Sequence, residues 1–175
     1  MFRRKFTCCF TGHRPQSLPC GTDERHPDCI KTKKLLREMI VYLINEKNIT
    51  HFISGMALGV DMWAAEMVIE LKIEYPHITL EAAVPCVTQC AKWSETSKER
   101  YSRLFHMCKK TTLIQKNYTS DCMMKRNKYM VKKSDFVIAV WTGKASGTAN
   151  TIAYARLKDK PVYCINPNNL SVTVL

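Results

Sequence analysis

Residues 51–61, with the sequence HFISGMALGVD, pass from a short apolar run through two glycines into a segment of helical periodicity. The apolar run predicts a buried strand. Ala64, Val68 and Leu71 lie one helical turn apart, which predicts that a helix follows. A strand that turns directly into a helix is the unit from which parallel α/β sheets are built.

The same alternation continues along the chain. Strands are predicted at Phe6–Thr11, His51–Ser54, Ile78–Val84, Thr112–Gln115, Phe136–Trp141 and Pro161–Ile165. Helices are predicted at Ile30–Glu46, Val60–Tyr75, Glu95–Lys109, Ser120–Lys133 and Thr148–Leu157. A helix that connects two parallel strands forms a right-handed crossover. We therefore predict one doubly wound, mainly parallel sheet with helices on both faces. This is a Rossmann-like α/β fold in a single domain over residues 1–175.

The composition is that of an ordinary globular chain, since 46% of the 175 residues are hydrophobic and 24% are charged. This usage excludes the disordered and collagen-like classes. The longest apolar runs, Met39–Ile44 and Phe136–Trp141, are too short to span a bilayer, and no secretory leader is recognised. We therefore expect a cytoplasmic protein without a membrane partner.

The nine cysteines are odd in number and include no C-x-x-C pair, which argues against a disulfide framework and against a zinc site. Cys86 and Cys90 come nearest to a ligand pair, but no matching pair accompanies them. Cys8, Cys9 and Cys164 fall in apolar strands, where a thiol packs as a small hydrophobic group. We expect reduced cysteines, no metal and no required cofactor.

Positive charge is concentrated in one part of the chain. The net charge is +12, and residues 101–150 carry ten basic against two acidic residues. Within that stretch, Lys125, Lys128 and Lys132 fall on one face of a predicted helix. Such a face either attracts a phosphate-bearing partner, nucleotide or nucleic acid, or is simply a solvated helix surface.

Ligands of doubly wound sheets bind at the carboxyl ends of the strands. The first strand leads into Gly12, His13 and Arg14, which offer close backbone approach and donors for phosphate. The turn after the second strand contains Ser54, Gly55, Met56, Gly59 and Asp61. Its backbone N–H groups at a helix start predict a phosphate cradle, with Asp61 bonding a ribose hydroxyl or capping the helix. No Walker pattern is present, which disfavours P-loop ATP hydrolysis.

The fifth predicted strand ends at Trp141 and leads into a second glycine-rich turn, where Gly147 and Thr148 begin a helix. Two anion-binding helix N-termini in one sheet suit a ligand with two phosphates, or with a phosphate and a sugar. The alternative is that both are merely tight turns. Arg126 and Asn127, just upstream, add further donors.

Three segments together resemble the SLOG superfamily, and its YpsA-like branch in particular. They are residues 54–61, the opening residues 11–15 (TGHRP) and the late Gly147-Thr148-Ala149, and the resemblance covers about residues 5–166. The resemblance implies a Rossmann-like fold. It also implies binding of nucleotides or NAD-derived signals, which several members bind, including in bacteria–phage conflict systems.

The resemblance also bears on catalysis. LOG-like phosphoribohydrolases of this superfamily cleave N-glycosidic bonds with an Arg and a Glu; Arg126 matches the Arg, but Thr151 stands where the Glu is expected. Without a carboxylate, the site lacks the group that stabilises an oxocarbenium-like transition state or activates water. The resemblance therefore implies a binder; if the protein is an enzyme, Arg126 and Glu66 are the catalytic candidates.

We accordingly expect a protein that recognises an ADP-ribose-like, NAD-derived or cyclic nucleotide signal and senses or sequesters it without turnover. A LOG-like nucleotide N-glycoside hydrolase is the first alternative, and a DNA-binding protein of the DNA-processing type is the second. Trp141 and Tyr118 offer rings for a base, or belong to the core. Apolar Met and Trp residues on helices would serve a homo-oligomer, which we expect, or the core.

Overall fold

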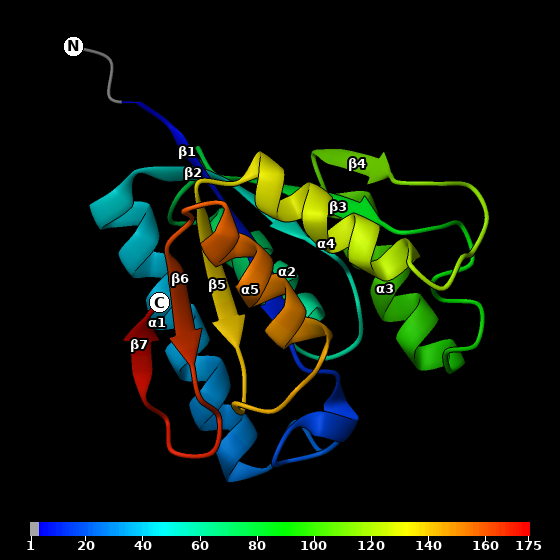
Figure 1. Cartoon of the computed structure of the whole chain (residues 1–175), viewed down its shortest axis with the longest axis horizontal. Coiled ribbons are helices and arrows are strands. Elements are labelled where there is room, and N and C mark those ends of the chain that lie inside the picture. Colours follow the sequence, from blue (N-terminus) through cyan, green and yellow to red (C-terminus); the bar gives the residue numbers. More distant parts are fainter. Residues whose placement is uncertain (1–3) are drawn as a thin grey trace.

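The computed structural model describes residues 4–175 as one seven-stranded sheet flanked by helices (Figure 1). The strands are β1 (Phe6–Gly12), β2 (Ile49–Ser54), β3 (Thr79–Val84), β4 (Lys110–Leu113), β5 (Phe136–Val140), β6 (Val162–Ile165) and β7 (Val172–Val174). The helices are α1 (Pro27–Lys47), α2 (Val60–Leu71), α3 (Glu95–Met107), α4 (Cys122–Lys133) and α5 (Gly147–Leu157). A short 3-10 turn, η1, covers Pro15–Ser17.

The strand order is β4-β3-β2-β1-β5-β6-β7, and all neighbouring pairs are parallel except β6 with β7. This confirms the predicted doubly wound, mainly parallel α/β fold. The order reverses at β1, because β2 to β4 lie on one side of it and β5 to β7 on the other. The carboxyl ends of β1 and β5 are therefore the place where folds of this kind bind ligands.

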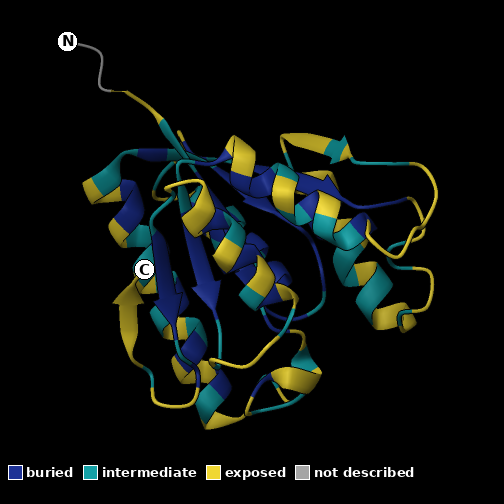
Figure 2. Ribbon diagram, viewed as in Figure 1, coloured by how far each residue is buried: buried dark blue, intermediate teal, exposed yellow. Residues whose placement is uncertain are grey.

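Helices cover both faces of the sheet, with α1 and α2 behind it and α4 and α5 in front in Figure 1. Alternate residues of β1 supply the two cores. Cys8 and Phe10 pack with α1 and α2, whereas Cys9 packs with α4 and α5. All three are fully buried, and Figure 2 shows the central strands in the colour of buried residues. Burial on both sides explains why these strands are continuous apolar runs.

The two edges of the sheet differ from the sequence prediction. β4 covers Lys110–Leu113 rather than Thr112–Gln115, and β7 is an additional strand, Val172–Val174, that the pattern does not predict. Both are short and mostly exposed (Figure 2), so burial imposes no apolar pattern on them. Over residues 4–175, no helix has the length and apolar character that crossing a membrane requires.

A buried carboxylate holds the β4 edge in place. Glu81 of β3 is only 2% exposed; its Oε1 accepts hydrogen bonds from Thr112 Oγ1 and Tyr129 OH, each at 2.7 Å. Its Oε2 lies 3.0 Å from Lys110 Nζ and 3.1 Å from His51 Nε2. Burial alone would raise the pKa of Glu81, but these four partners outweigh it and lower the pKa to about 2. One side chain thus links β2, β3, β4 and α4.

We predict that Glu81→Gln lowers the free energy of unfolding at pH 7 by about 2–3 kcal/mol, because charged hydrogen bonds in a buried site are lost. The carboxyl titrates near its ordinary 4.5 in the unfolded chain and near 2 in the folded protein, so its stabilisation is complete above pH 4.5 and fades toward pH 2. Urea unfolding of both proteins at pH 7, 4 and 2.5 tests this. A stability difference that stays constant down to pH 2.5 would contradict it.

Candidate functional site

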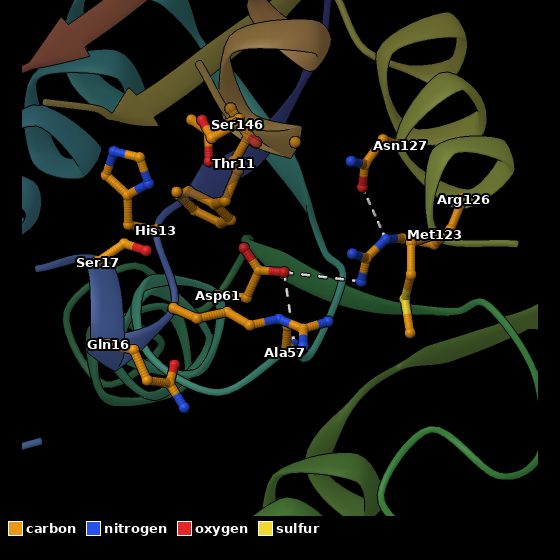
Figure 3. A pocket seen from close by; sticks show the side chains of 15 residues that line it. Thr11, His13, Gln16, Ser17, Ala57, Asp61, Met123, Arg126, Asn127 and Ser146 are labelled. Atoms are coloured by element: carbon orange, nitrogen blue, oxygen red, sulfur yellow. Dashed lines mark hydrogen bonds and ion pairs between the residues drawn. The ribbon is translucent and has the colours of Figure 1, made fainter. Parts of the chain in front are cut away.

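A cavity of about 270 Å³ opens where the loop after β1 meets the starts of α4 and α5 (Figure 3). Predicted site residues that line it are Gly12, His13, Arg14, Asp61, Arg126, Asn127, Gly147 and Thr148. Residues that the sequence reasoning did not single out complete the lining: Phe10, Thr11, Gln16, Ser17, Ala57, Met123 and Ser146. The fold therefore brings the segment after β1, α2, α4 and α5 to one cavity.

Arg126 is the centre of this arrangement. Its side chain is 6% exposed, and Figure 3 shows its guanidinium turned from α4 toward Asp61. Nη1 donates to the carbonyl of Gly55 and lies 3.7 Å from Asp61 Oδ2, while Nε donates to Asn127 Oδ1 at 2.9 Å. Burial lowers the pKa of Arg126 and Asp61 opposes this shift. A guanidinium nevertheless keeps its charge, and a buried charge is costly unless it has partners. Arg126 therefore requires the acceptors that Gly55, Asp61 and Asn127 provide.

Gly55 makes room for that guanidinium. A Cβ on Gly55 would lie 2.0 Å from Arg126 Nη1 and 2.6 Å from Asp61 Oδ2, well inside van der Waals contact. Two further glycines bring the turns together: a Cβ on Gly12 would meet Val60 at 2.5 Å, and Gly59 has a φ of 89°. The glycines of the predicted cradle therefore serve close packing between β1, α2 and α4.

The turn before α2 already contains an anion. Asp61 Oδ2 accepts a hydrogen bond from the Ala57 N–H at 3.4 Å as well as facing Arg126. Burial raises the pKa of Asp61, and Arg126 acts against that shift. Ser54 Oγ donates to the Asp61 carbonyl at 2.8 Å and accepts from the Met56 N–H at 3.1 Å. One donor of the predicted phosphate cradle, the Ala57 N–H, is therefore directed at the Asp61 side chain.

The remaining predicted residues of this turn are buried and do not line the cavity. They are Ser54, Gly55, Met56 and Gly59. Met56 also has a left-handed backbone, with a φ of 55°. Ser54 and Gly55 contact Asp61 and Arg126 directly, so these two are positioning residues for that pair.

The start of α5 is open. Ser146 caps the helix, because its Oγ accepts from the Ala149 N–H at 3.2 Å. Within residues 4–175, the N–H groups of Gly147 and Thr148 have no protein acceptor, and a Cβ on Gly147 would meet nothing within 4 Å. These two N–H groups and the dipole of an 11-residue helix make this end of the cavity attractive to an anion.

His13 and Arg14 complete the cavity. His13 Nε2 accepts the Thr142 N–H at 3.0 Å, so the ring carries its proton on Nδ1. Burial, with a further contribution from Lys144, lowers the pKa of His13, which favours the neutral ring. Arg14 is exposed, and its side chain makes no ion pair with any described residue. His13 therefore offers a neutral donor and Arg14 a positive charge available to a ligand.

A second polar cavity, of about 410 Å³, continues from the first beyond His13. His13, Gln16, Ser17 and Ser146 line both cavities. The second also includes Thr142, Lys144 and Asn168. The polar surface available to a ligand therefore extends past the start of α5.

Three further residues that the sequence analysis discussed also lie outside the lining of the cavity. Thr151 is buried, donates to the Gly147 carbonyl at 2.8 Å and accepts from Asn127 Nδ2 at 2.9 Å, so it joins α4 to α5. Glu66 is paired with Arg100 at 2.6 Å. The Trp141 indole donates to the Lys144 carbonyl at 2.7 Å and packs on the core beneath α4 and α5.

The lysines of α4 are exposed, but two of them have partners. Lys125 Nζ lies 3.1 Å from Asp121 Oδ2, and Lys128 Nζ lies 5.6 Å from the centre of the Tyr154 ring. Lys132 is exposed. The helix therefore presents a basic outer side, while Arg126 and Asn127 of the same helix face the cavity.

Sequence reasoning missed the polar residues of η1 and the helix cap, Gln16, Ser17 and Ser146. Signals for them exist in the chain. Pro15 directly after Arg14 is a turn signal, and a serine before a predicted helix start is a capping signal.

Comparison with known proteins identifies relatives that span most of the chain. Residues 8–170 match the YpsA family model, described as the YspA SLOG family. The SPbeta prophage-derived protein YoqJ of Bacillus subtilis (strain 168) is 32% identical over 144 residues, which are 75% of this chain and 84% of that protein. A UPF0398 protein of Bacillus thuringiensis (strain Al Hakam) is 31% identical over 150 residues, 85% of this chain and 80% of that one.

Solved structures share the fold at low sequence identity. DNA processing protein A of Helicobacter pylori, which binds single-stranded DNA, superposes with a TM-score of 0.60 and 18% identity over 92% of this chain. DNA processing protein A (DprA) of Streptococcus pneumoniae gives 0.61 and 16% over 91%. The chain spans 65% and 50% of the lengths of these two proteins.

We predict that Gly55→Ala destabilises the protein by at least about 2 kcal/mol, because the new methyl group displaces the buried Arg126 guanidinium. Gly147→Ala is the matched control. It adds the same methyl group in open space at a helix start and should change stability by less than about 0.5 kcal/mol. Chemical unfolding of the two variants decides the question, and equal stabilities would show that the Gly55–Arg126 contact is not essential.

Proposed function

The chain belongs to the YspA SLOG family, and we propose that it binds a nucleotide through its phosphates at the cavity between β1 and α5, without turnover. The ligand class that we propose is the one expected from the sequence, an ADP-ribose-like, NAD-derived or cyclic nucleotide. Binding would serve to sense or to sequester that signal, and a role in bacteria–phage conflict is part of the same proposal.

One observation carries the proposal. Gly147 and Thr148, whose N–H groups have no acceptor among the described residues, line the same cavity as Arg14, whose guanidinium also has no partner there. Backbone donors at a helix start and a planar guanidinium are together suited to phosphate oxygens. His13 and Asn127 add neutral donors beside them, which suit the hydroxyl groups of a ribose.

The carboxylates argue for binding without hydrolysis. Among the described residues that line the cavity, Asp61 is the one carboxylate, and its Oδ2 is engaged by Arg126 and the Ala57 N–H. Thr151 and Glu66 have structural partners of their own. Cleavage of an N-glycosidic bond calls for a carboxylate that is able to reach the sugar or a water molecule. LOG-like hydrolysis is therefore the less favoured alternative.

Binding of single-stranded DNA is the second candidate. It is favoured by the exposed lysines of α4 close to the cavity and by the shared fold with the DNA processing proteins. The same cavity would then hold a backbone phosphate, and Lys125, Lys128 and Lys132 would contact the neighbouring phosphates.

The test is a depletion experiment with purified protein and a panel of AMP, ADP, NAD, ADP-ribose and cyclic nucleotides. We expect one of these to be removed from the filtrate and to return intact when the protein is heated. Arg14→Ala should weaken that binding by about 10- to 100-fold, since it removes a hydrogen-bonded charge. Arg25→Ala is the control, because the Arg25 side chain is 97% exposed and does not line the cavity.

Two other results of this experiment would favour the hydrolase or the DNA-binding alternative. Recovery of a free base and a sugar phosphate would contradict binding without turnover and favour the hydrolase. If no nucleotide is depleted but a single-stranded oligonucleotide is bound with an affinity that falls steeply with salt, the DNA-binding candidate replaces the proposal.

A further inference from the structure

A third cavity, of about 530 Å³, adjoins the phosphate site on the side opposite to the second polar cavity. It lies between the segments that follow β3 and β4, and Arg14 and Met123 line both it and the phosphate cavity. Its other lining residues include Cys86, Gln89, Trp93 and Tyr118. Unlike the two polar cavities, it is walled largely by aromatic, aliphatic and thiol groups.

Trp93 is held in a fixed position in this wall. Its ring meets Tyr101 edge-on, with ring centres 5.6 Å apart at 84°, and Tyr101 stacks on Phe105 at 5.6 Å and 28°. Both partners belong to α3, so the Trp93 ring is supported by a rigid element. A supported aromatic wall is what a planar ligand requires, because the protein does not have to order the ring on binding.

Tyr118, unlike Trp93, is an exposed ring of this cavity. It is 66% exposed, although it lines a cavity, and no hydrogen bond or ring contact involves it within residues 4–175. An exposed tyrosine next to an anion site is a stacking surface for a nucleobase, since every base has a π-face.

Gln89, which lines the cavity, fixes its wall to the turn after β2. Its Nε2 donates to the Gly55 carbonyl at 2.9 Å, and because a carbonyl only accepts, the orientation of the amide is fixed. Its Oε1 is then an acceptor that is buried and has no partner among the described residues.

We propose that this third cavity binds the nucleobase of the ligand whose phosphate occupies the adjoining site, with Tyr118 and Trp93 as its stacking surfaces. The inference rests on the proposed function. Continuity with the phosphate site identifies the occupant, because Arg14 at the shared boundary would contact the phosphate while the attached base enters the aromatic cavity. The base belongs either to a free nucleotide or to a single strand.

The test compares AMP with ribose 5-phosphate, which lacks only the base, by calorimetry. We expect wild-type protein to bind AMP at least about 10-fold more tightly than ribose 5-phosphate. Tyr118→Ala, a change at an exposed residue, should weaken AMP binding by about 5- to 100-fold and leave ribose 5-phosphate unaffected. Tyr118→Phe keeps the ring and should restore binding of AMP.

The outcomes separate this inference from the function on which it rests. Equal affinities for AMP and ribose 5-phosphate, or no effect of Tyr118→Ala on AMP, would overturn the base site and leave phosphate binding intact. If a 5′-phosphorylated deoxyadenosine hexamer depends on Tyr118 and AMP does not bind, the base site stands and its source is a strand. If none of the three probes binds, the base site fails, whereas the proposed function fails only if the whole nucleotide panel of the depletion experiment is also left unbound.

Discussion

The ion pair between Arg126 and Asp61 is the interaction on which the rest of the site depends. A guanidinium buried beneath α4 needs acceptors, and it obtains them from the Gly55 carbonyl and the Asp61 carboxylate. This requirement explains why residue 55 has no side chain and why Asp61 turns inward at the start of α2. It also joins α4 to the turn between β2 and α2, which sets the floor of the cavity.

One consequence is that the starts of α2 and α5, which are similar in sequence, differ in structure. At the start of α2, the Ala57 N–H and Arg126 both face the side chain of Asp61, a group that belongs to the protein. The start of α5 keeps the N–H groups of Gly147 and Thr148 open toward the cavity. The proposed phosphate site therefore lies at α5, whose first residues line the same cavity as Arg14, and Thr151 of that helix anchors Asn127.

Local patterns predicted most of the fold, because the buried central strands and amphipathic helices leave strong signals in the chain. The family resemblance was likewise confirmed, as it rests on the glycine turns. The exposed edge strands β4 and β7 carry weaker signals, since burial does not constrain them. The sequence did not predict that the Asp61 side chain contacts Arg126, because these two residues are far apart in the chain. The unpaired Oε1 of Gln89 is likewise a property of tertiary contacts alone.

The central claim is that an anion binds at the start of α5 and not at that of α2. Amide NMR spectra of ¹⁵N-labelled protein, recorded while inorganic pyrophosphate is added, test it directly. We predict that the largest shifts with saturation occur at the N–H groups of Gly147 and Thr148, whereas those of Ala57 and Val60 change little. Larger shifts at Ala57 and Val60 than at Gly147 and Thr148 would contradict it.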